Sequence, residues 1–337
     1  MAAANSEGNA QKPTLETFQL FSSSASGFGI FDDAAQQLPA IPPPPCVEVL
    51  ASEVFFLHPS RFLDTPSFFT FCVPSSVKHN VDSVNLDGVT LLKGRVNTQQ
   101  VFGLSNSDLV PGKYEVATLI PFGLGGLKLW EGSLDLIKAL QSDIKNGLIS
   151  FGGKRVLEVG CGHGLPGIFA LLEGAAAVHF QDFNAEVLRC LTIPNLNANL
   201  SGESQPSSSN LTICDKAEIR FFAGDWSEID KLLPHVSTDA KHNQGDGYDF
   251  ILMAETVYSI NSLQNLYNLI KKCSIQCLQH PDGVVYMAAK KYYFGVGGGS
   301  RRFLSVVEKD GVMTCSLVAE ITDGSSNVRE VWKLAYK

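Results

Sequence analysis

The sequence has 337 residues, of which 45% are hydrophobic and 18% are charged, so it can bury a sizeable core and is not disordered throughout. Its 34 acidic and 26 basic residues give a net charge of −8, which argues against a nucleic-acid backbone as the main partner, because phosphate binding requires clustered Lys and Arg. We therefore expect no direct contact with nucleic acid, whereas a basic protein partner is compatible with this charge.

No segment reaches the roughly 18 consecutive apolar residues of a membrane-spanning helix. The first residues show neither the basic nor the apolar region of a signal peptide, so we expect neither membrane insertion nor secretion. Of the eight cysteines, Cys273 and Cys277 lie closest, four residues apart on a predicted helix without nearby histidines. This pattern predicts reduced core thiols and no metal site.

Three regions differ in composition. Residues 1–45 are rich in Ala, Ser, Gly, Gln and Pro, which predicts a disordered arm. Residues 46–112 alternate short apolar runs with Pro and Gly, as in Val54–Leu57, Phe68–Val73 and Val89–Leu92, and we interpret them as a cap or wrap of short strands. Residues 113–337 then form the main domain.

The main domain begins with a predicted helix over Ser133–Leu140, where Leu134, Ile137 and Leu140 recur at helical spacing. Trp130 and Glu131 lie just before it. Trp130 either fills the core or lines a ligand pocket beside the first strand.

The stretch Arg155–Gly167, RVLEVGCGHGLPG, carries the strongest signal. Its apolar run predicts a buried parallel strand, and Leu165–Glu173 predicts a helix. Between them the glycines let the backbone approach a ligand, and free N–H groups at the helix start face that ligand. Strand, glycine loop and helix together indicate a nucleotide-type cofactor pocket. A dinucleotide fingerprint would need glycine where Leu165 stands, so the motif is of another kind.

A second predicted strand, Ala177–Gln181, ends on Asp182, about 20 residues beyond the loop, where an open α/β fold places a carboxylate for ribose hydroxyls. Asp182 alone is equally well a helix cap, but together with the loop it favours the ribose role. Ala185–Leu200 predicts a helix that Pro194 kinks or restarts.

A third strand, Glu218–Ala223, is followed by Gly224, Asp225 and Trp226, an acidic and an aromatic residue that suit an adenine base. The alternative roles are a cap for Asp225 and a surface anchor for Trp226.

The remaining pattern completes an α/β order. Strands are predicted at Tyr248–Ala254 and Gly283–Ala289 around a helix at Ser262–Leu278, and Met313–Ile321 with Val328–Tyr336 predicts a terminal antiparallel hairpin. Glu255 and Tyr258 follow the fourth strand at the mouth of the same cleft. We therefore predict a doubly wound, Rossmann-like parallel sheet that ends in an antiparallel pair.

Four segments make the resemblance closer: HFQDFN at 179–184, RFFAGDWSEI at 220–229, ILMAETVYS at 251–259 and AAKKYYFGVGGG at 288–299. With the glycine loop E-x-G-x-G-x-G they resemble the histidine protein methyltransferase 1 family, from about Asn85 to the C-terminus. The resemblance implies a seven-stranded enzyme that uses S-adenosylmethionine to methylate a histidine of a large-subunit ribosomal protein. We also expect the protein to be a monomer and to be located in the cytoplasm and nucleus. The resemblance implies these cofactor contacts: Trp130, Glu131, Glu158, Gly160, Gly162, Asp182, Asn184, Gly224, Asp225, Trp226 and Ala254.

For the chemistry we expect Glu255 or Tyr258 to hydrogen-bond the imidazole and so select its reactive tautomer. An equally good role for Glu255 is a structural bond to the glycine loop. The segment Tyr293–Gly299 is expected to shape the substrate slot, with Tyr293, Phe294, Gly295 and Gly297 in contact with the substrate. Two alternatives stay open, a protein-lysine methyltransferase of the same fold and a non-catalytic module that binds S-adenosylmethionine.

One departure from the family pattern KYEGGLKxWE is that Val116–Gly125 separates Glu115 from Gly126. We interpret Val116–Gly125 as an in-frame insertion just before Trp130, and expect its deletion to tighten the binding of S-adenosylmethionine.

Overall fold

The structure, a computed structural model, describes residues 45–51, 80–95, 128–200, 217–234, 247–274, 283–322, 324 and 327–337. All of these residues belong to one compact unit that extends from Pro43 to Lys337. Several predictions concern residues outside these ranges. They are the arm up to residue 44, the strands Val54–Leu57 and Phe68–Val73, and the insertion Val116–Gly125.

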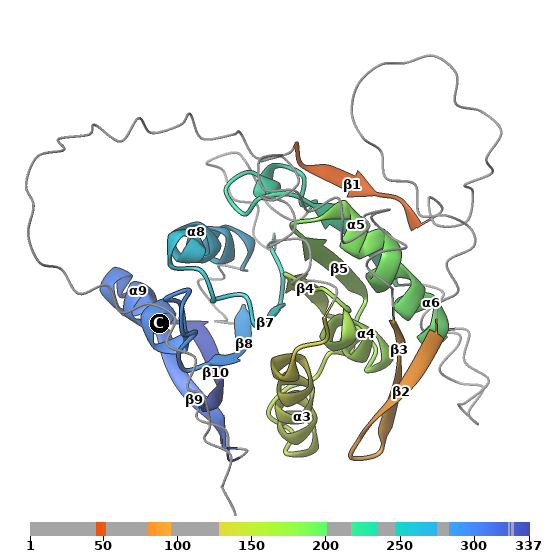
Figure 1. Cartoon of the computed structure of the whole chain (residues 1–337), viewed down its shortest axis with the longest axis horizontal. Coiled ribbons are helices and arrows are strands. Elements are labelled where there is room, and N and C mark those ends of the chain that lie inside the picture. Colours follow the sequence, from red (N-terminus) through yellow and green to blue (C-terminus); the bar gives the residue numbers. More distant parts are fainter. Residues whose placement is uncertain are drawn as a thin grey trace, which may run out of the picture. The chain divides into compact units, whose positions relative to one another are not determined.

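An eight-stranded sheet lies at the centre of the unit, in the order β1, β6, β5, β4, β7, β8, β10, β9 (Figure 1). The strands β6, β5, β4, β7 and β8 are parallel, β1 is antiparallel to β6, and β10 is antiparallel to both β8 and β9. The strand bounds are β1 Val47–Val49, β4 Arg155–Val159, β5 Ala177–Asp182, β6 Glu218–Ala223, β7 Phe250–Ala254, β8 Val284–Lys290, β9 Met313–Ile321 and β10 Arg329–Tyr336. The predicted doubly wound sheet with a C-terminal antiparallel hairpin is confirmed.

The eighth strand is β1, which extends the seven predicted strands at the β6 edge. It pairs Val47 with Ala223 and Val49 with Phe221, and a bidentate ion pair joins Glu48 to Arg220 at 2.7 Å. Three residues are too few to show an alternating pattern, so this strand could not be predicted from its residues.

The chain reverses its direction of travel across the sheet beside β4. From β4 it moves outward to β5 and β6, and it then crosses back to β7 on the other side of β4. In open α/β sheets a crevice forms outside the carboxyl ends of the strands at such a switch point. The glycine loop after β4 and the residues after β7 therefore share one edge of the sheet.

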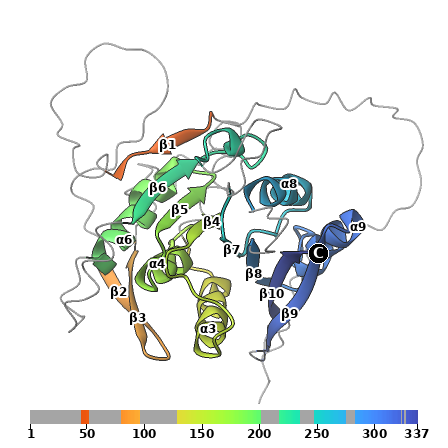
Figure 2. The same ribbon diagram turned by 180° about the vertical axis from the view of Figure 1, so that it is seen from behind.

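Helices cover both faces of the sheet, with α3, α4, α5 and α6 on one side and α8 and α9 on the other, as the view from behind shows (Figure 2). The helix bounds are α3 Glu131–Lys145, α4 Leu165–Leu172, α5 Ala185–Val187, the π-helix η2 Leu188–Thr192, α6 Ile193–Leu200, the 3-10 turns η3 Ile229–Lys231 and η4 Ile260–Ser262, α8 Leu263–Cys273 and α9 Ser300–Asp310.

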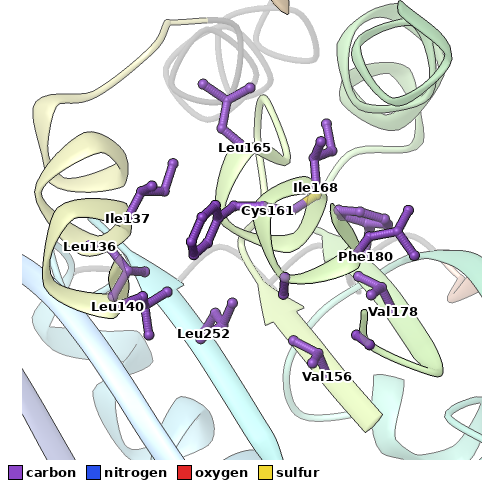
Figure 3. Packing of buried hydrophobic residues seen from close by; sticks show 14 of the residues in the cluster. Leu136, Ile137, Leu140, Val156, Cys161, Leu165, Ile168, Val178, Phe180 and Leu252 are labelled. Atoms are coloured by element: carbon purple, nitrogen blue, oxygen red, sulfur yellow. The ribbon is translucent and has the colours of Figure 1, made fainter. Parts of the chain in front are cut away.

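Successive residues of each central strand point to opposite faces of the sheet and belong to two separate cores. In β4, Val156 packs with Leu136, Ile168 and Phe180 on the α3 and α4 face, as the close view shows (Figure 3). Its neighbour Leu157 belongs to the core on the α8 and α9 face. Both positions are fully buried, which explains why these two successive residues are apolar instead of alternating with polar ones.

The predicted interruption at Pro194 takes the form of a π-helix. The turn η2 ends at Thr192, and α6 follows it without a break and has Pro194 as its second residue. Such π-turns are frequent at functional sites. Here the turn places Thr192 against the glycine loop.

A two-stranded hairpin packs beside α6, formed by β2 Asn80–Leu86 and β3 Val89–Arg95. Its turn is Asp87–Gly88, and both residues have positive φ, 39° and 100°, as the Asp-Gly turn of a tight hairpin requires. Leu86 and Leu91 join the core on the α3 and α4 face. The predicted strand Val89–Leu92 thus forms most of β3.

Within the described ranges, no helix is both long and apolar enough to cross a bilayer. The same residues contain no group of three or more His, Cys, Asp and Glu side chains arranged to hold a metal ion.

Candidate cofactor and active site

The backbone of the loop after β4 is strongly curved. Gly160, Gly162 and Gly164 have φ values of 62°, 51° and 70°, in the left-handed region that glycine adopts without strain. A Cβ on Gly160 would stand 2.6 Å from Cγ2 of Thr256, so the loop passes against the segment after β7 with no space for a side chain. Packing within the protein thus excludes a side chain at Gly160, and the approach of a cofactor to this loop stays a prediction.

Asp182 at the end of β5 holds this loop. Its Oδ2 accepts the N–H of Gly162 at 3.0 Å, and its Oδ1 accepts the N–H of Asn184, the N-cap of α5, at 3.0 Å. Burial raises the pKa of Asp182 to about 6, although the backbone N–H donors oppose this shift. A carboxylate can accept about four hydrogen bonds, so Asp182 keeps room for a further donor, as the ribose role requires.

Glu158 of β4 lies on the inner side of the loop. Its Oε2 accepts the N–H of Gly167 at 2.8 Å, and only 2% of the residue is exposed. Burial raises the pKa of this carboxyl well above its usual range. In this position Glu158 orients the start of α4, because its hydrogen bond is to the backbone of Gly167.

Gln181 joins three parts of the site, and the sequence analysis assigned it no role. Its Oε1 accepts the N–H of Gly160 at 3.3 Å and the indole N–H of Trp226 at 3.0 Å, while its Nε2 donates to the carbonyl of Gly224 at 2.9 Å. It is fully buried. Its place next to Asp182 was the one available signal.

The residues after β6 lie at the same edge. The N–H of Gly224 donates to the carbonyl of Asp182 at 3.0 Å, and a Cβ at Gly224 would collide with Cys46. Asp225 accepts the N–H and hydroxyl of Ser227 through Oδ1, so it does act as a cap. Trp226 stands beside Gly160 rather than out on the surface.

Trp130 is the N-cap of α3, and the ammonium groups of Lys128 and Lys290 lie 4.3 and 5.3 Å from its ring centre. Glu131, the first helical residue, is exposed. Lys290 ends β8, so Trp130 lies at the same edge as Ala254, which ends β7 beside it.

Glu255 follows Ala254 in a conformation that few non-glycine residues adopt, with φ at 57°. Its side chain fits against Gly132 of α3, where a Cβ would stand 2.8 Å from Oε1. The hydroxyl of Tyr293 donates to Oε2, and burial raises the pKa of the Glu255 carboxyl. Backbone strain of this kind, about 1–3 kcal/mol, persists where the surroundings fix it, and it concentrates at functional sites.

The segment Tyr293–Gly299 is held closely against the segment after β7. The N–H groups of Gly298 and Gly299 donate to the carbonyls of Tyr258 and Val257 at 3.0 and 2.8 Å, and Ser259 bridges Gly297. Phe294 is 74% exposed and Gly295 is exposed beside it, whereas Tyr258 packs edge-on to Tyr293 with ring centres 6.5 Å apart. Of the predicted substrate residues, Tyr293 and Gly297 are therefore partly buried, whereas Phe294 and Gly295 are exposed.

Two buried oxygens at this edge test whether S-adenosylmethionine fits. Within the described residues, Glu255 Oε1 and Thr256 Oγ1 have no hydrogen-bond partner, although neither side chain is more than 8% exposed. Since most buried polar atoms are hydrogen-bonded, these two oxygens are candidates for a partner that the described residues do not supply. Together with the tight glycine loop and the acceptor Asp182, they fit a ligand with polar groups and a ribose.

A family model described as "Lysine methyltransferase" matches residues 123–310. The histidine protein methyltransferase 1 homologue of Dictyostelium discoideum is 38% identical over 234 residues, 69% of this chain and 62% of that protein. The homologue of Bos taurus is 34% identical over 255 residues, 72% of this chain and 62% of that protein. The chain thus spans about three fifths of the length of these relatives.

These relatives confirm the resemblance that the sequence motifs indicated, and a methyltransferase family implies S-adenosylmethionine as the cofactor. Since the family model covers more than half of the 337 residues, the chain belongs to the methyltransferase family that this model describes.

Proposed function

We propose that this chain transfers a methyl group from S-adenosylmethionine to a histidine imidazole of a protein substrate. The observation that carries the proposal is the Glu255 carboxylate at the switch point of the sheet, with Oε2 bonded to Tyr293 and Oε1 without a partner among the described residues. A neutral imidazole offers one N–H donor and one lone pair. A fixed acceptor of this kind selects which nitrogen stays unprotonated.

The residues that would hold the cofactor surround the glycine loop. Gly160 and Gly162 give the loop its left-handed turn under the cofactor, Asp182 accepts from the ribose, Trp226 offers a ring to the adenine, and Thr256 Oγ1 offers an unpaired polar atom. When bound, S-adenosylmethionine supplies a methyl group activated by its sulfonium.

The chain's own groups then do three things. Glu255 accepts the imidazole N–H at Oε1, so the lone pair of the other nitrogen faces the methyl donor. Tyr293 fixes the orientation of Glu255, and Gly132 leaves room for it. As the ring gains positive charge on methylation, the ionised Glu255 stabilises that charge in a buried site where electrostatic interactions are strong.

The rim of the site supports a protein substrate. Five large side chains around Tyr293–Gly299 and the segment after β7 are exposed: Tyr258, Ile260, Tyr292, Phe294 and Val296, at 36–74%. Exposed apolar side chains gathered at one place mark surfaces that bind other macromolecules. The finer proposal of a large-subunit ribosomal protein rests on the resemblance to histidine protein methyltransferase 1 alone.

A lysine substrate is the second candidate, because the family model is described as "Lysine methyltransferase". A lysine must lose a proton before it attacks, and a carboxyl whose pKa is raised by burial, such as Glu255, is a competent base. The same geometry therefore serves an amine, and the identity of the methylated residue separates the two functions.

The test of the proposal is incubation of the purified chain with isotope-labelled S-adenosylmethionine and a protein extract. We expect label in protein, and its loss when Asp182 is changed to Asn. Cofactor binding by calorimetry without any transfer to protein would contradict the proposal and favour a non-catalytic binding module. Absence of binding would contradict both functions.

A further inference from the structure

The hairpin β2–β3 is attached to α6 by two asparagines one helical turn apart. Asn199 exchanges two hydrogen bonds with Leu92, its Oδ1 accepting from the N–H at 2.8 Å and its Nδ2 donating to the carbonyl at 2.7 Å. Asn195 accepts the N–H of Gly94 through Oδ1 at 2.5 Å. Along this stretch of β3, the two side-chain amides make hydrogen bonds of the kind that a neighbouring strand would make.

Asn195 also reaches the glycine loop. Its Nδ2 donates to the carbonyl of His163 at 2.9 Å and lies 3.4 Å from His163 Nδ1. Only 1% of Asn195 and 6% of His163 are exposed. One buried amide group therefore joins the hairpin through its oxygen and the loop of the proposed cofactor site through its nitrogen.

The loop has a second support from the same segment. Thr192 at the end of η2 donates its hydroxyl to the carbonyl of Gly162 at 2.7 Å, and its Cγ2 fills the space where Gly164 lacks a Cβ. The carbonyls of two successive loop residues, Gly162 and His163, are thus both held by the segment η2–α6. The N–H of Gly162 is held from the other side by Asp182.

We propose that Asn195 is a positioning residue for the cofactor loop, and that its bond to Gly94 of the hairpin holds it in the orientation that favours the binding of S-adenosylmethionine. The inference deepens the proposed function, because it rests on the glycine loop being the cofactor site. Gly94 holds the Asn195 amide in the rotamer that reaches His163. Without that bond the amide gains rotational freedom, and the loop loses a fixed donor before the ligand arrives.

Asn199 supplies the matched control, because it bonds the hairpin as Asn195 does. Within the described residues its side-chain hydrogen bonds go to Leu92 and Asn195 and not to the loop. Asn195→Ala removes the side-chain hydrogen bonds to both Gly94 and His163. Asn195→Asp keeps an oxygen for Gly94 and removes the donor to His163. Asn199→Ala and Asn199→Asp make the same chemical changes on the hairpin alone.

The test measures two quantities on the full chain: the affinity for S-adenosylmethionine by calorimetry, and the amide hydrogen exchange of residues 160–168 without cofactor. We expect both Asn195 variants to weaken binding about five- to tenfold, the effect of one lost buried hydrogen bond, and to speed loop exchange. Asn199→Ala should lower the melting temperature yet change the affinity less than twofold.

Equal effects of the Asn195 and Asn199 variants on loop exchange, or no effect of either, would overturn the inference. If Asn195→Ala fails to fold, Asn195→Asp against Asn199→Asp gives the same comparison. A wild-type chain that binds no S-adenosylmethionine would instead overturn the proposed function, and the exchange measurement would still decide whether the hairpin supports the loop.

Discussion

The hydroxyl of Tyr293 donates a hydrogen bond to Oε2 of Glu255, and this bond joins the loop after β8 to the strained residue after β7. Burial raises the pKa values of both groups, with the Glu255 charge adding to the shift of Tyr293. The tyrosine hydroxyl is therefore the donor and the carboxylate the acceptor, and Glu255 Oε1 is left without a hydrogen-bond partner among the described residues.

Glu255→Gln should lower kcat about 100-fold, the lower range for a positioned acid or base. A glutamine has only one side-chain oxygen, so it cannot accept one hydrogen bond from Tyr293 and another from an imidazole on separate oxygens. It is also neutral and cannot balance the positive charge of the methylated ring. The affinity for S-adenosylmethionine should change less than threefold. Glu308→Gln on the exposed side of α9 is the control. Unchanged turnover of Glu255→Gln would leave the residue with a structural role only.

Asp182 should make cofactor binding depend on pH. Its pKa of about 6 means that the folded chain without ligand takes up a proton near that pH, whereas ribose hydroxyls prefer the ionised carboxylate. Affinity should fall by up to about tenfold per pH unit below 6. Calorimetry between pH 5 and 7.5 should show this slope in the wild type and a flat profile in Asp182→Asn. A wild-type profile as flat as that of the variant would contradict the role.

The same raised pKa has an effect of opposite sign on stability. A carboxyl whose pKa is higher in the folded than in the unfolded chain stabilises the fold at low pH, and this contribution disappears as pH rises from about 4 to about 6. Asp182→Asn should remove this part of the pH dependence of the unfolding free energy. Denaturant titrations at pH 4.5 and 6.5 give the change in unfolding free energy between these pH values. The same change in the wild type and in Asp182→Asn would contradict the raised pKa of Asp182.

Glu330 should be a major determinant of stability near the substrate slot. The residue is fully buried, and it accepts from Ser300 at 2.5 Å, from Arg301 at 2.6 Å and from Trp332 at 3.0 Å. Glu330→Ala should cost about 3 kcal/mol, because it leaves buried donors without their charged acceptor. Glu320→Ala, which removes an exposed partner 3.9 Å from Lys291, should cost less than about 1 kcal/mol. Equal losses in the two variants would contradict this account.

Gly298 should be required for the form of the substrate slot. A Cβ there would collide with the carbonyl oxygens of Val257 and Tyr258, so Gly298→Ala must separate the two segments. We expect the KM for the protein substrate to rise more than about tenfold, as for a misplaced binding element. Gly311→Ala provides a conservative control, because its φ of 71° strains an alanine but its Cβ meets nothing closer than 4.0 Å. A KM shift no larger than that of the control would refute the requirement.

Local patterns in the sequence predicted much of this fold. The apolar run of β4, the glycines after it and the acidic end of β5 lie within about thirty residues, and their order dictates a parallel α/β start. The terminal hairpin followed from two alternating runs around a turn. Each of these signals depends on neighbours in the chain and on a pattern long enough to recognise.

The other features depend on contacts between distant segments. Gln181 gains its role only because β6 places Gly224 and Trp226 beside it, and Asn195 because β3 packs on α6. The left-handed φ of Glu255 is fixed by Tyr293 and Gly132, which lie far away in the sequence. No local propensity predicts such a conformation for a glutamate.

The identity of the methylated residue decides between a histidine and a lysine substrate. Substrate protein labelled by the purified chain and S-adenosylmethionine is hydrolysed in acid, and its amino acids are separated against methylhistidine and methyllysine standards. The account predicts that the label is recovered as methylhistidine and is absent from the reaction with Glu255→Gln. Label recovered as methyllysine would contradict it.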